Sequence, residues 1–170
     1  MATSTLEPPA AVESSDSGSL GEATSQIVSF RLTNEEYGID IMRVQEIILI
    51  GHITQMPNVP PYVRGLINLR GHVLPIIDLG IRFGLGDTEP TEQSRIIVLN
   101  QEARTVGIIV DAVDEVLRIN VEQIEEVSSA FMGAGQDYVR SLVKFKSKLL
   151  ILLDVDRLLA EEDVTASAGA

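Results

Sequence analysis

The residues that could carry out chemistry are few and poorly placed for it. The chain has two histidines, His52 and His72, and no cysteine. Neither histidine has a second one at a spacing that favours zinc, and disulfides and a cysteine nucleophile are excluded. A Ser-His-Asp arrangement could draw on His72 and Asp78, but no Gly-x-Ser-x-Gly motif accompanies them. We therefore expect no catalytic residue, no metal site and no cofactor.

Carboxylates are the one abundant reactive group. They form two clusters, which are Asp111, Asp114 and Glu115, and Glu122, Glu125 and Glu126. The first cluster lacks the oxygen-rich spacing of a calcium loop, so a solvated acidic face is the simpler interpretation. A small carboxylate-dependent hydrolase on a β-barrel scaffold is the alternative. It requires a deep pocket that holds Asp111 or Glu115 beside His72.

Composition and charge restrict the class of partner. The 170 residues include 13 basic and 25 acidic side chains, which gives a net charge of −12. Nucleic-acid binding requires clustered Lys and Arg, so we expect no nucleic-acid partner. No stretch of about 18 consecutive apolar residues is present, and residues 1–25 lack the features of a signal peptide. We expect a cytoplasmic protein with no direct membrane insertion.

The two ends of the chain differ in composition from its middle. Residues 1–25 are small and polar, with two prolines and four acids, and residues 161–170 resemble them. Such segments bury too little apolar surface to offset the entropy lost on ordering. We expect a disordered leader over 1–25 and a disordered tail over 161–170, which leaves one folded domain at 26–160.

Short apolar runs rich in β-branched residues predict a mostly β domain. Residues 27–32 alternate between apolar and polar, and a polar turn separates them from residues 37–41, which predicts a hairpin. Further strands are predicted at 73–77, 96–99, 106–110 and 149–153. Only two short helices are predicted, at 78–83 and 154–160, and each opens with an aspartate that can cap free N–H groups.

The sequence contains an internal repeat. At an offset of 76 residues, Tyr62–Leu79 matches Tyr138–Val155 in kind, with six identities. At an offset of 69 residues, Gly38-Ile39 matches Gly107-Ile108. The spacing is too long for a solenoid repeat. It predicts two pseudo-symmetric, five-stranded β-barrel subdomains, with repeat halves of about 27–83 and 96–159.

The segment from Tyr37 to Ile47 carries more apolar residues than one five-stranded unit obviously needs. A groove between two subdomains could accept a partner helix, and an exposed strand edge could accept a partner strand. The alternative is that these residues simply fill the two small cores. With catalytic motifs absent, the sequence favours a protein that works by contact.

Several motifs in this region resemble the CheW family of chemotaxis coupling proteins. They are Tyr37-Gly-Ile-Asp-Ile, Val44-Gln-Glu-Ile47, the stretch PPYVRGLINLRG at 60–71, and Val73-Leu-Pro-Ile-Ile-Asp-Leu79. The resemblance covers about residues 26–160. It implies two interleaved SH3-like barrel subdomains and the function of a noncatalytic scaffold that couples chemoreceptors (methyl-accepting chemotaxis proteins) to the CheA histidine kinase.

The resemblance also implies partners and a location. Members of the family bind the cytoplasmic tip of chemoreceptors in the groove between subdomains and dock the regulatory domain of the kinase. A member in the cytoplasm would thus associate with membrane receptor arrays. An adaptor of the same family in a non-flagellar chemosensory pathway fits the sequence equally well.

Six residues match functional positions of the family. Glu46 and Arg70 match a Glu and an Arg that pair across the first subdomain. The other positions that resemble partner-contacting ones are Ile41, Val44, Arg64 and Ile96. The resemblance implies that loss of the Glu46–Arg70 pair would disturb the surface that partners contact.

Overall fold

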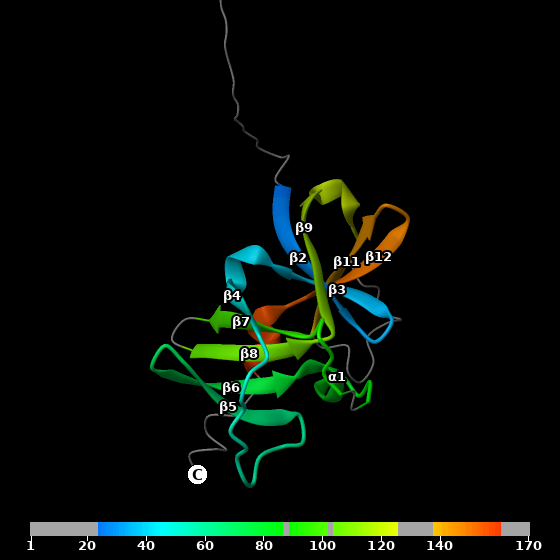
Figure 1. The fold of residues 1–170 in the computed structure, drawn as a ribbon. Helices are drawn as coiled ribbons and strands as arrows, with labels where there is room; N and C mark the ends of the chain where they lie inside the picture. The colour runs from blue at the N-terminus through cyan, green and yellow to red at the C-terminus, as the bar shows by residue number, and fades with distance from the viewer. Residues whose placement is uncertain (1–23, 87–88, 102–103, 126–137, 161–170) are drawn as a thin grey trace, which may run out of the picture.

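The computed structural model describes residues 24–86, 89–101, 104–125 and 138–160, and two β-sheets make up most of them (Figure 1). The predicted mostly β architecture is confirmed. The expected disorder of the leader and tail falls outside the described residues, except at Thr24 and Ser25. These two begin strand β2, because the ladder between β2 and β9 starts at the pair Thr24 and Asn120.

One sheet has six strands in the order β10-β11-β12-β3-β2-β9. Its strands are β2 (Thr24–Leu32), β3 (Glu35–Asp40), β9 (Ala112–Asn120), β10 (Ile124–Glu125), β11 (Val139–Phe145) and β12 (Lys148–Leu153). We call this sheet and its interior the six-stranded subdomain. It joins the first strands of the chain to the last ones, which Figure 1 shows as blue and orange ribbons in its upper part.

The other sheet has five strands in the order β4-β7-β8-β6-β5. Its strands are β4 (Val44–Leu49), β5 (Val63–Leu69), β6 (His72–Asp78), β7 (Arg95–Gln101) and β8 (Arg104–Val110). We call it the five-stranded subdomain. It occupies the lower part of Figure 1.

The two halves of the sequence repeat are interleaved between these sheets. Parallel pairs form where strands of different halves meet, β12 with β3 and β6 with β8. Leu152 pairs with Gly38, and Ile76 pairs with Gly107. The offsets of 76 and 69 residues convert one pair into the other, so the sequence repeat is a pseudo-symmetry of the structure.

Gly38 and Gly107 allow close packing at these two crossings. A Cβ atom on Gly38 would lie 2.6 Å from Cδ2 of Leu150, and one on Gly107 would lie 2.6 Å from Cδ1 of Ile76. Both distances are too short for carbon atoms in contact. The glycines therefore permit large side chains to cover the parallel strand pairs.

Three groups of buried side chains form the core. The largest lies between the sheets and contains residues of both, including Phe30, Tyr37, Ile77, Leu99 and Ile108. The six-stranded subdomain encloses Ile27, Leu117, Ile119, Val143, Leu150 and Leu152. The five-stranded subdomain encloses Leu74, Ile76, Ile96, Val98 and Ile109. Each subdomain thus has an interior of its own, and the central group joins them.

Each sheet is extended by a short stretch of pairing on its β5 or β11 side. In the five-stranded subdomain Thr54 forms an isolated bridge with Leu66 of β5, through two backbone hydrogen bonds of 2.8 Å. In the six-stranded subdomain Glu125 of β10 pairs with Leu142 of β11. Leu66 and Leu142 are equivalent at the offset of 76, so β10 is the counterpart of the Thr54 bridge. This explains the sixth strand where five were predicted, and the architecture fits two SH3-like barrels.

The predicted short helices are present, with their predicted caps. Helix α1 is Leu79–Arg82, and the Asp78 carboxylate accepts a hydrogen bond from the Ile81 N–H at 3.2 Å. Helix α2 is Val155–Ala160, and the Asp154 carboxylate accepts one from the Arg157 N–H at 3.1 Å. Two 3-10 turns, η3 (Ile41–Arg43) and η4 (Val121–Gln123), complete the described elements. None of the helices in the described ranges has the length and apolar character needed to span a membrane.

We expect Gly65→Ala to destabilise the fold strongly. Gly65 has φ +146, and a Cβ atom there would lie 2.1 Å from the backbone oxygen of Thr54, which cannot move without breaking the bridge to β5. The expected cost is about 3 kcal/mol in the free energy of unfolding, measured by chemical denaturation. Gly51→Ala is the matched control, because nothing lies within 4 Å of its Cβ position. Equal stability of the two variants would contradict the close packing of β5 against the Thr54 backbone.

Candidate functional site

Glu46 and Arg70 form a two-pronged ion pair on the five-stranded subdomain. Glu46 lies on β4, and Arg70 lies in the turn between β5 and β6. Nη1 of Arg70 donates to Oε2 of Glu46 at 2.5 Å, and Nη2 donates to Oε1 at 2.8 Å. β4 and β5 are the first and last strands of the sheet order. The ion pair therefore links opposite edges of one sheet, as the resemblance to the family predicts.

The turn that carries Arg70 holds the backbone in a conformation that L-residues rarely adopt. Arg70 has φ +54 and Gly71 has φ +88, as in the two-residue primed turns that match the twist of a β-hairpin. The Gly71 N–H donates to Oδ1 of Asn68 at 2.8 Å, which fixes the turn further. Lys146 and Ser147 have φ +50 and +65 in the equivalent turn of the other subdomain. Arg70 is thus presented from a rigid hairpin tip.

A β-bulge places Glu46 on its strand. In the ladder with β7, Val44 pairs with Leu99 and Glu46 pairs with Val98, so Gln45 is the extra residue. Bulges redirect the side chains that follow them. Exposure nevertheless alternates along the whole strand, with Val44 and Glu46 half-buried and Gln45 exposed. The carboxylate of Glu46 faces the hairpin tip that carries Arg70.

Solvent reaches both partners of the ion pair, but to different extents. The side chain of Glu46 is 22% exposed and that of Arg70 is 69% exposed. The hydrogen bonds from Arg70 lower the pKa of the Glu46 carboxyl below its ordinary value. The same hydrogen bonds raise the pKa of Arg70. The pair is therefore fully ionised near neutral pH and presents an arginine to the outside.

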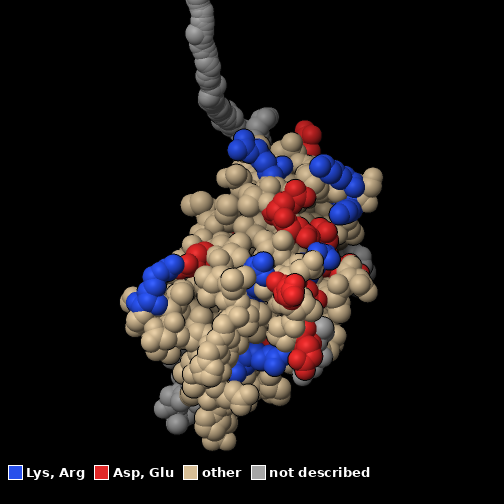
Figure 2. Space-filling model, in the orientation of Figure 1, with Lys and Arg blue, Asp and Glu red and all other residues tan. Residues whose placement is uncertain are grey.

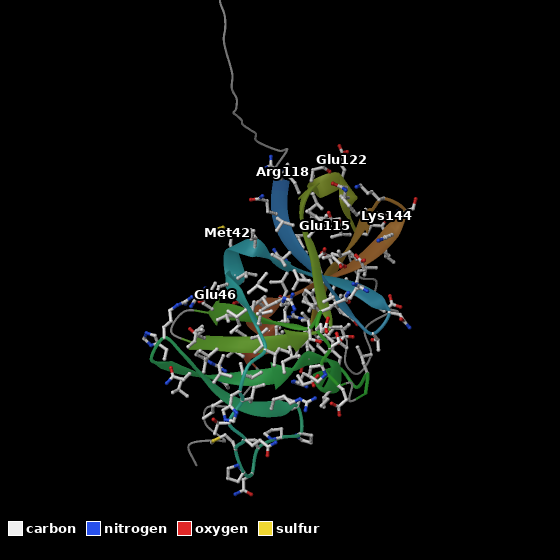
Figure 3. The ribbon with its side chains drawn as sticks, in the orientation of Figure 1. Met42, Glu46, Glu115, Arg118, Glu122 and Lys144 are labelled. Atoms are coloured by element: carbon white, nitrogen blue, oxygen red, sulfur yellow. The ribbon has the colours of Figure 1, made fainter. Side chains whose placement is uncertain are left out.

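Exposed apolar side chains lie on the same part of the chain as Glu46. Met42 of η3 is 79% exposed and Leu49 of β4 is 70% exposed, with Ile47 between them. Figure 3 shows Met42 and Glu46 on the same side of the molecule. Single exposed apolar residues are ordinary, but three on an edge strand and the 3-10 turn that precedes it are typical of an interaction surface. We call Met42, Glu46, Ile47, Leu49 and Arg70 the clasp surface.

A shallow hollow adjoins Arg70. Its volume is about 470 Å³, and its lining includes Gln45, Arg70, His72 and the exposed Val73. On the face that Figure 2 shows, side chains of both signs are interspersed, without a large region of one sign. Contact at the clasp surface would thus combine apolar burial with a few directed polar contacts rather than rely on net charge.

Arg64 is committed to a contact inside the protein. Its Nε and Nη2 donate to Oδ2 of Asp78 at 3.0 and 2.8 Å. The other carboxylate oxygen of Asp78 caps helix α1, as described above. Asp78 is buried, and the side chain of Arg64 is 31% exposed. Arg64 therefore holds the start of α1 and presents only part of its side chain to solvent.

The hydrophobic residues among the predicted contact positions differ in their exposure. Ile41 of η3 and Val44 of β4 are half-buried, and Val44 packs against the central core. Ile96 of β7 has 0% exposure and belongs to the interior of the five-stranded subdomain. The expectation that Ile96 contacts a partner is therefore wrong. Its side chain points into the barrel, where its Cγ2 lies 2.8 Å from the Cβ position of Gly107.

The groups required by the hydrolase alternative do not come together. The Asp111 carboxylate accepts a hydrogen bond from the Thr33 backbone at 2.7 Å, and Glu115 is exposed on β9 of the six-stranded subdomain. His72 begins β6 in the other subdomain, and neither acid lines the hollow beside it. Within the described ranges, no group of three His, Cys, Asp or Glu residues could hold a metal ion. The hydrolase alternative therefore lacks the arrangement that it requires.

Sequence reasoning missed part of the clasp surface. It marked residues 37–47 as unusually apolar but did not separate Met42 and Ile47, which are exposed, from Ile39, which is fully buried. It did not include Leu49. Exposure alternates along β4 with the period of two of a strand, which the sequence could have indicated, but the 3-10 turn that contains Met42 has no such period.

We expect Arg70→Ala to raise the pKa of Glu46 towards its ordinary value, because it removes the two hydrogen bonds that favour the ionised form. The pKa of Glu46 is lower in the folded state than in the unfolded chain. The pair therefore stabilises the fold at pH values above the unfolded-state pKa, and this stabilisation is lost as the pH falls through the lowered, folded-state pKa. NMR titration of the Glu46 side chain measures the midpoint. Lys146→Ala, at the equivalent turn, is the control and should leave it unchanged. An unmoved midpoint in Arg70→Ala would contradict the assignment.

Comparisons with known proteins agree with this architecture. The family model described as CheW-like domain matches residues 26–163. The chain is 39% identical to "Chemotaxis protein CheW" of Klebsiella aerogenes over 145 residues, which is 85% of this chain and 87% of that protein. It is 34% identical to "Chemotaxis protein CheW" of Treponema pallidum over 150 residues, 85% of this chain and 87% of that protein.

A solved structure is also similar. The "scaffolding protein TtCheW" from Thermoanaerobacter tengcongensis superimposes with a TM-score of 0.72 at 36% identity, covering 77% of this chain and 89% of that one. Sequence and structure thus give the same answer over most of the chain. The chain therefore belongs to the CheW family of chemotaxis scaffold proteins.

Proposed function

We propose that this protein is a noncatalytic scaffold that couples chemoreceptors to the CheA histidine kinase. The observation that carries the proposal is the clasp surface, in which an ionised Glu46–Arg70 pair and exposed apolar side chains occupy the same edge of the five-stranded subdomain, alternating along β4. Within the part of the chain that the structure describes, no group of three His, Cys, Asp or Glu side chains could hold a metal ion. Membership of a family whose relatives are named chemotaxis proteins supports the pathway.

The Glu46–Arg70 pair suits recognition better than stabilisation. Ion pairs reached by solvent add little to the stability of a fold, because water solvates both partners in the unfolded chain. A guanidinium held on a rigid turn can instead contribute to recognition. It can exchange or share its carboxylate with a partner, and its planar donors impose a direction on that contact. We infer that Arg70 orients a partner that the apolar side chains of β4 bind.

Two kinds of partner are proposed, the cytoplasmic tip of a chemoreceptor and the regulatory domain of the kinase. Scaffolding requires contacts that can be made at the same time, and two modest contacts raise the effective concentration of each partner for the other. The two subdomains offer separate faces for this purpose. Residues 26–160 act as one unit in the cytoplasm, at arrays of membrane receptors.

Reversing one charge of the pair should weaken partner binding while leaving the fold intact. Arg70→Glu and Glu46→Arg each place like charges together, and we expect about a tenfold loss of affinity for a receptor-tip fragment or for the kinase regulatory domain. The double variant restores an ion pair of opposite sense and should recover part of the loss. Calorimetry measures the affinities, and chemical denaturation checks that the unfolding midpoint changes little.

Lys146→Glu is the matched control for these reversals, because Lys146 occupies the equivalent turn of the six-stranded subdomain. It should bind as the unmodified chain does. If the variants with a single charge reversal bind both partners normally, the clasp surface is not the contact surface, even though the chain belongs to the family.

Reconstitution tests the scaffold function itself. Kinase autophosphorylation should rise when receptor, kinase and this protein are combined, and it should not rise when any one is omitted. Full coupling without this protein would refute the proposal. The non-flagellar alternative is separated from chemotaxis by capture of kinase and receptor from the native cytoplasm, since the identity of the co-purifying receptor distinguishes the two pathways.

A further inference from the structure

Arg82 lies between two tyrosines that occupy equivalent places in the two halves of the repeat. Its guanidinium carbon is 4.7 Å from the ring centre of Tyr62 and 4.7 Å from the ring centre of Tyr138. Its Nη2 also donates a hydrogen bond to the Tyr138 hydroxyl. A planar cation between two aromatic faces is held by both rings at once.

The two tyrosines belong to different subdomains. Tyr62 directly precedes β5 of the five-stranded subdomain, and Tyr138 directly precedes β11 of the six-stranded one. The backbone oxygen of Tyr62 accepts from the Asp78 N–H at 2.7 Å, and that of Tyr138 accepts from the Asp154 N–H at 2.8 Å. Each tyrosine is thereby fixed to the cap of the helix in its own half. Arg82, on α1, joins the two fixed points.

The contact breaks the symmetry of the repeat. At the offset of 76, the counterpart of Arg82 is Leu158, which is fully buried in the central core. One half therefore supplies a cation where the other supplies a leucine. Two symmetric arginines would place like charges near one another, whereas one arginine can serve both rings. The asymmetry indicates a specific role for Arg82 at the junction.

A row of aromatic rings extends the junction into the six-stranded subdomain. The ring centres of Phe83 and Tyr138 are 5.8 Å apart, those of Tyr37 and Phe83 are also 5.8 Å apart, and those of Phe30 and Tyr37 are 6.0 Å apart. The row runs from α1 to β3 and β2. Aromatic pairs and stacked guanidinium groups have preferred distances and angles, whereas the aliphatic contacts of the central core are non-directional.

We propose that Arg82 is a positioning residue that fixes the orientation of the two subdomains and so aligns the faces that contact partners. The second part rests on the proposed function. The close-packed core brings the sheets together, and the Arg82 contact adds directional interactions across their junction. The Arg82 contact restricts the angle between the sheets, because the guanidinium must stay close to two rings that belong to different subdomains and to the hydroxyl of Tyr138.

Residual dipolar couplings of the backbone N–H groups test the orientation directly. In the unmodified chain, couplings from both sheets should fit one alignment tensor. In Arg82→Met, which keeps side-chain length but removes the cation and its donors, the two sheets should require different tensors while each still fits its own. Arg157→Met is the matched control, since it removes an arginine from helix α2, and it should retain a single tensor. A single tensor in Arg82→Met would overturn the proposal.

Smaller changes keep the test decisive if Arg82→Met folds poorly. Arg82→Lys keeps the cation but not the planar fork, and Tyr138→Phe keeps the ring but not the hydroxyl acceptor. Both should show a smaller divergence between the two tensors than Arg82→Met does, and the divergence should be larger in Arg82→Lys than in Tyr138→Phe. Unchanged tensors in both, with folding confirmed by chemical denaturation, would overturn the proposal as well.

The link to partners is tested with a fragment of the chemoreceptor tip. Arg82→Met should bind it about five- to tenfold more weakly, and Arg157→Met should bind it normally. Diverging tensors with unchanged affinity would overturn the link to partner binding. Absence of binding by the unmodified chain would instead contradict the proposed function, and the tensor measurement would still decide the role of Arg82.

Discussion

The parallel pairing of strands from opposite halves of the chain is the constraint on which the rest of this structure depends. β3 can complete its sheet only with β12, and β6 only with β8. Parallel pairs are made by strands distant in sequence, so each pair stabilises the fold only after a long loop has been closed. Gly38 and Gly107 make both pairs possible, because large side chains occupy the space that a Cβ atom would need. Two subdomains result, and each contains strands from both halves of the sequence.

This architecture separates structural from recognition roles among similar residues. Asp78 and Arg64 are hydrogen-bonded at a helix start, and their pair holds backbone in place. Glu46 and Arg70 are hydrogen-bonded across the two edges of a sheet, where solvent reaches them. The chemistry of the two pairs is the same. Their burial and their position in the sheet order decide which one a partner can contact.

Some of this could be predicted from sequence, for identifiable physical reasons. The aspartates that open α1 and α2 cap free N–H groups locally, so a short window of sequence predicts them. The repeat offsets predicted the pseudo-symmetry, because equivalent packing positions require similar residues. The pairing of Glu46 with Arg70 came from resemblance alone, since the residues meet through a bulge and a turn that no periodic pattern encodes.

Other features were misread from the sequence or could not be predicted from it. Ile96 was expected to contact a partner and is fully buried. Its equivalence to Ile27, at the offset of 69, carried the signal that it faces a barrel interior. The start of β2 at Thr24 depends on pairing with Asn120, and composition cannot report a partner so far along the chain. The Arg82 sandwich was equally hidden, because it joins the ends of two different sheets.

The interleaved topology has a consequence for synthesis on the ribosome. Strands β4 to β8 form a contiguous stretch, so the five-stranded subdomain can assemble while the nascent chain is still growing. The hairpin of β2 and β3 cannot complete its pairing until β12, a much later strand, has been synthesised. Until β12 emerges, the edge of β3 that β12 will cover stays unpaired, and an unpaired strand edge is where neighbouring chains associate.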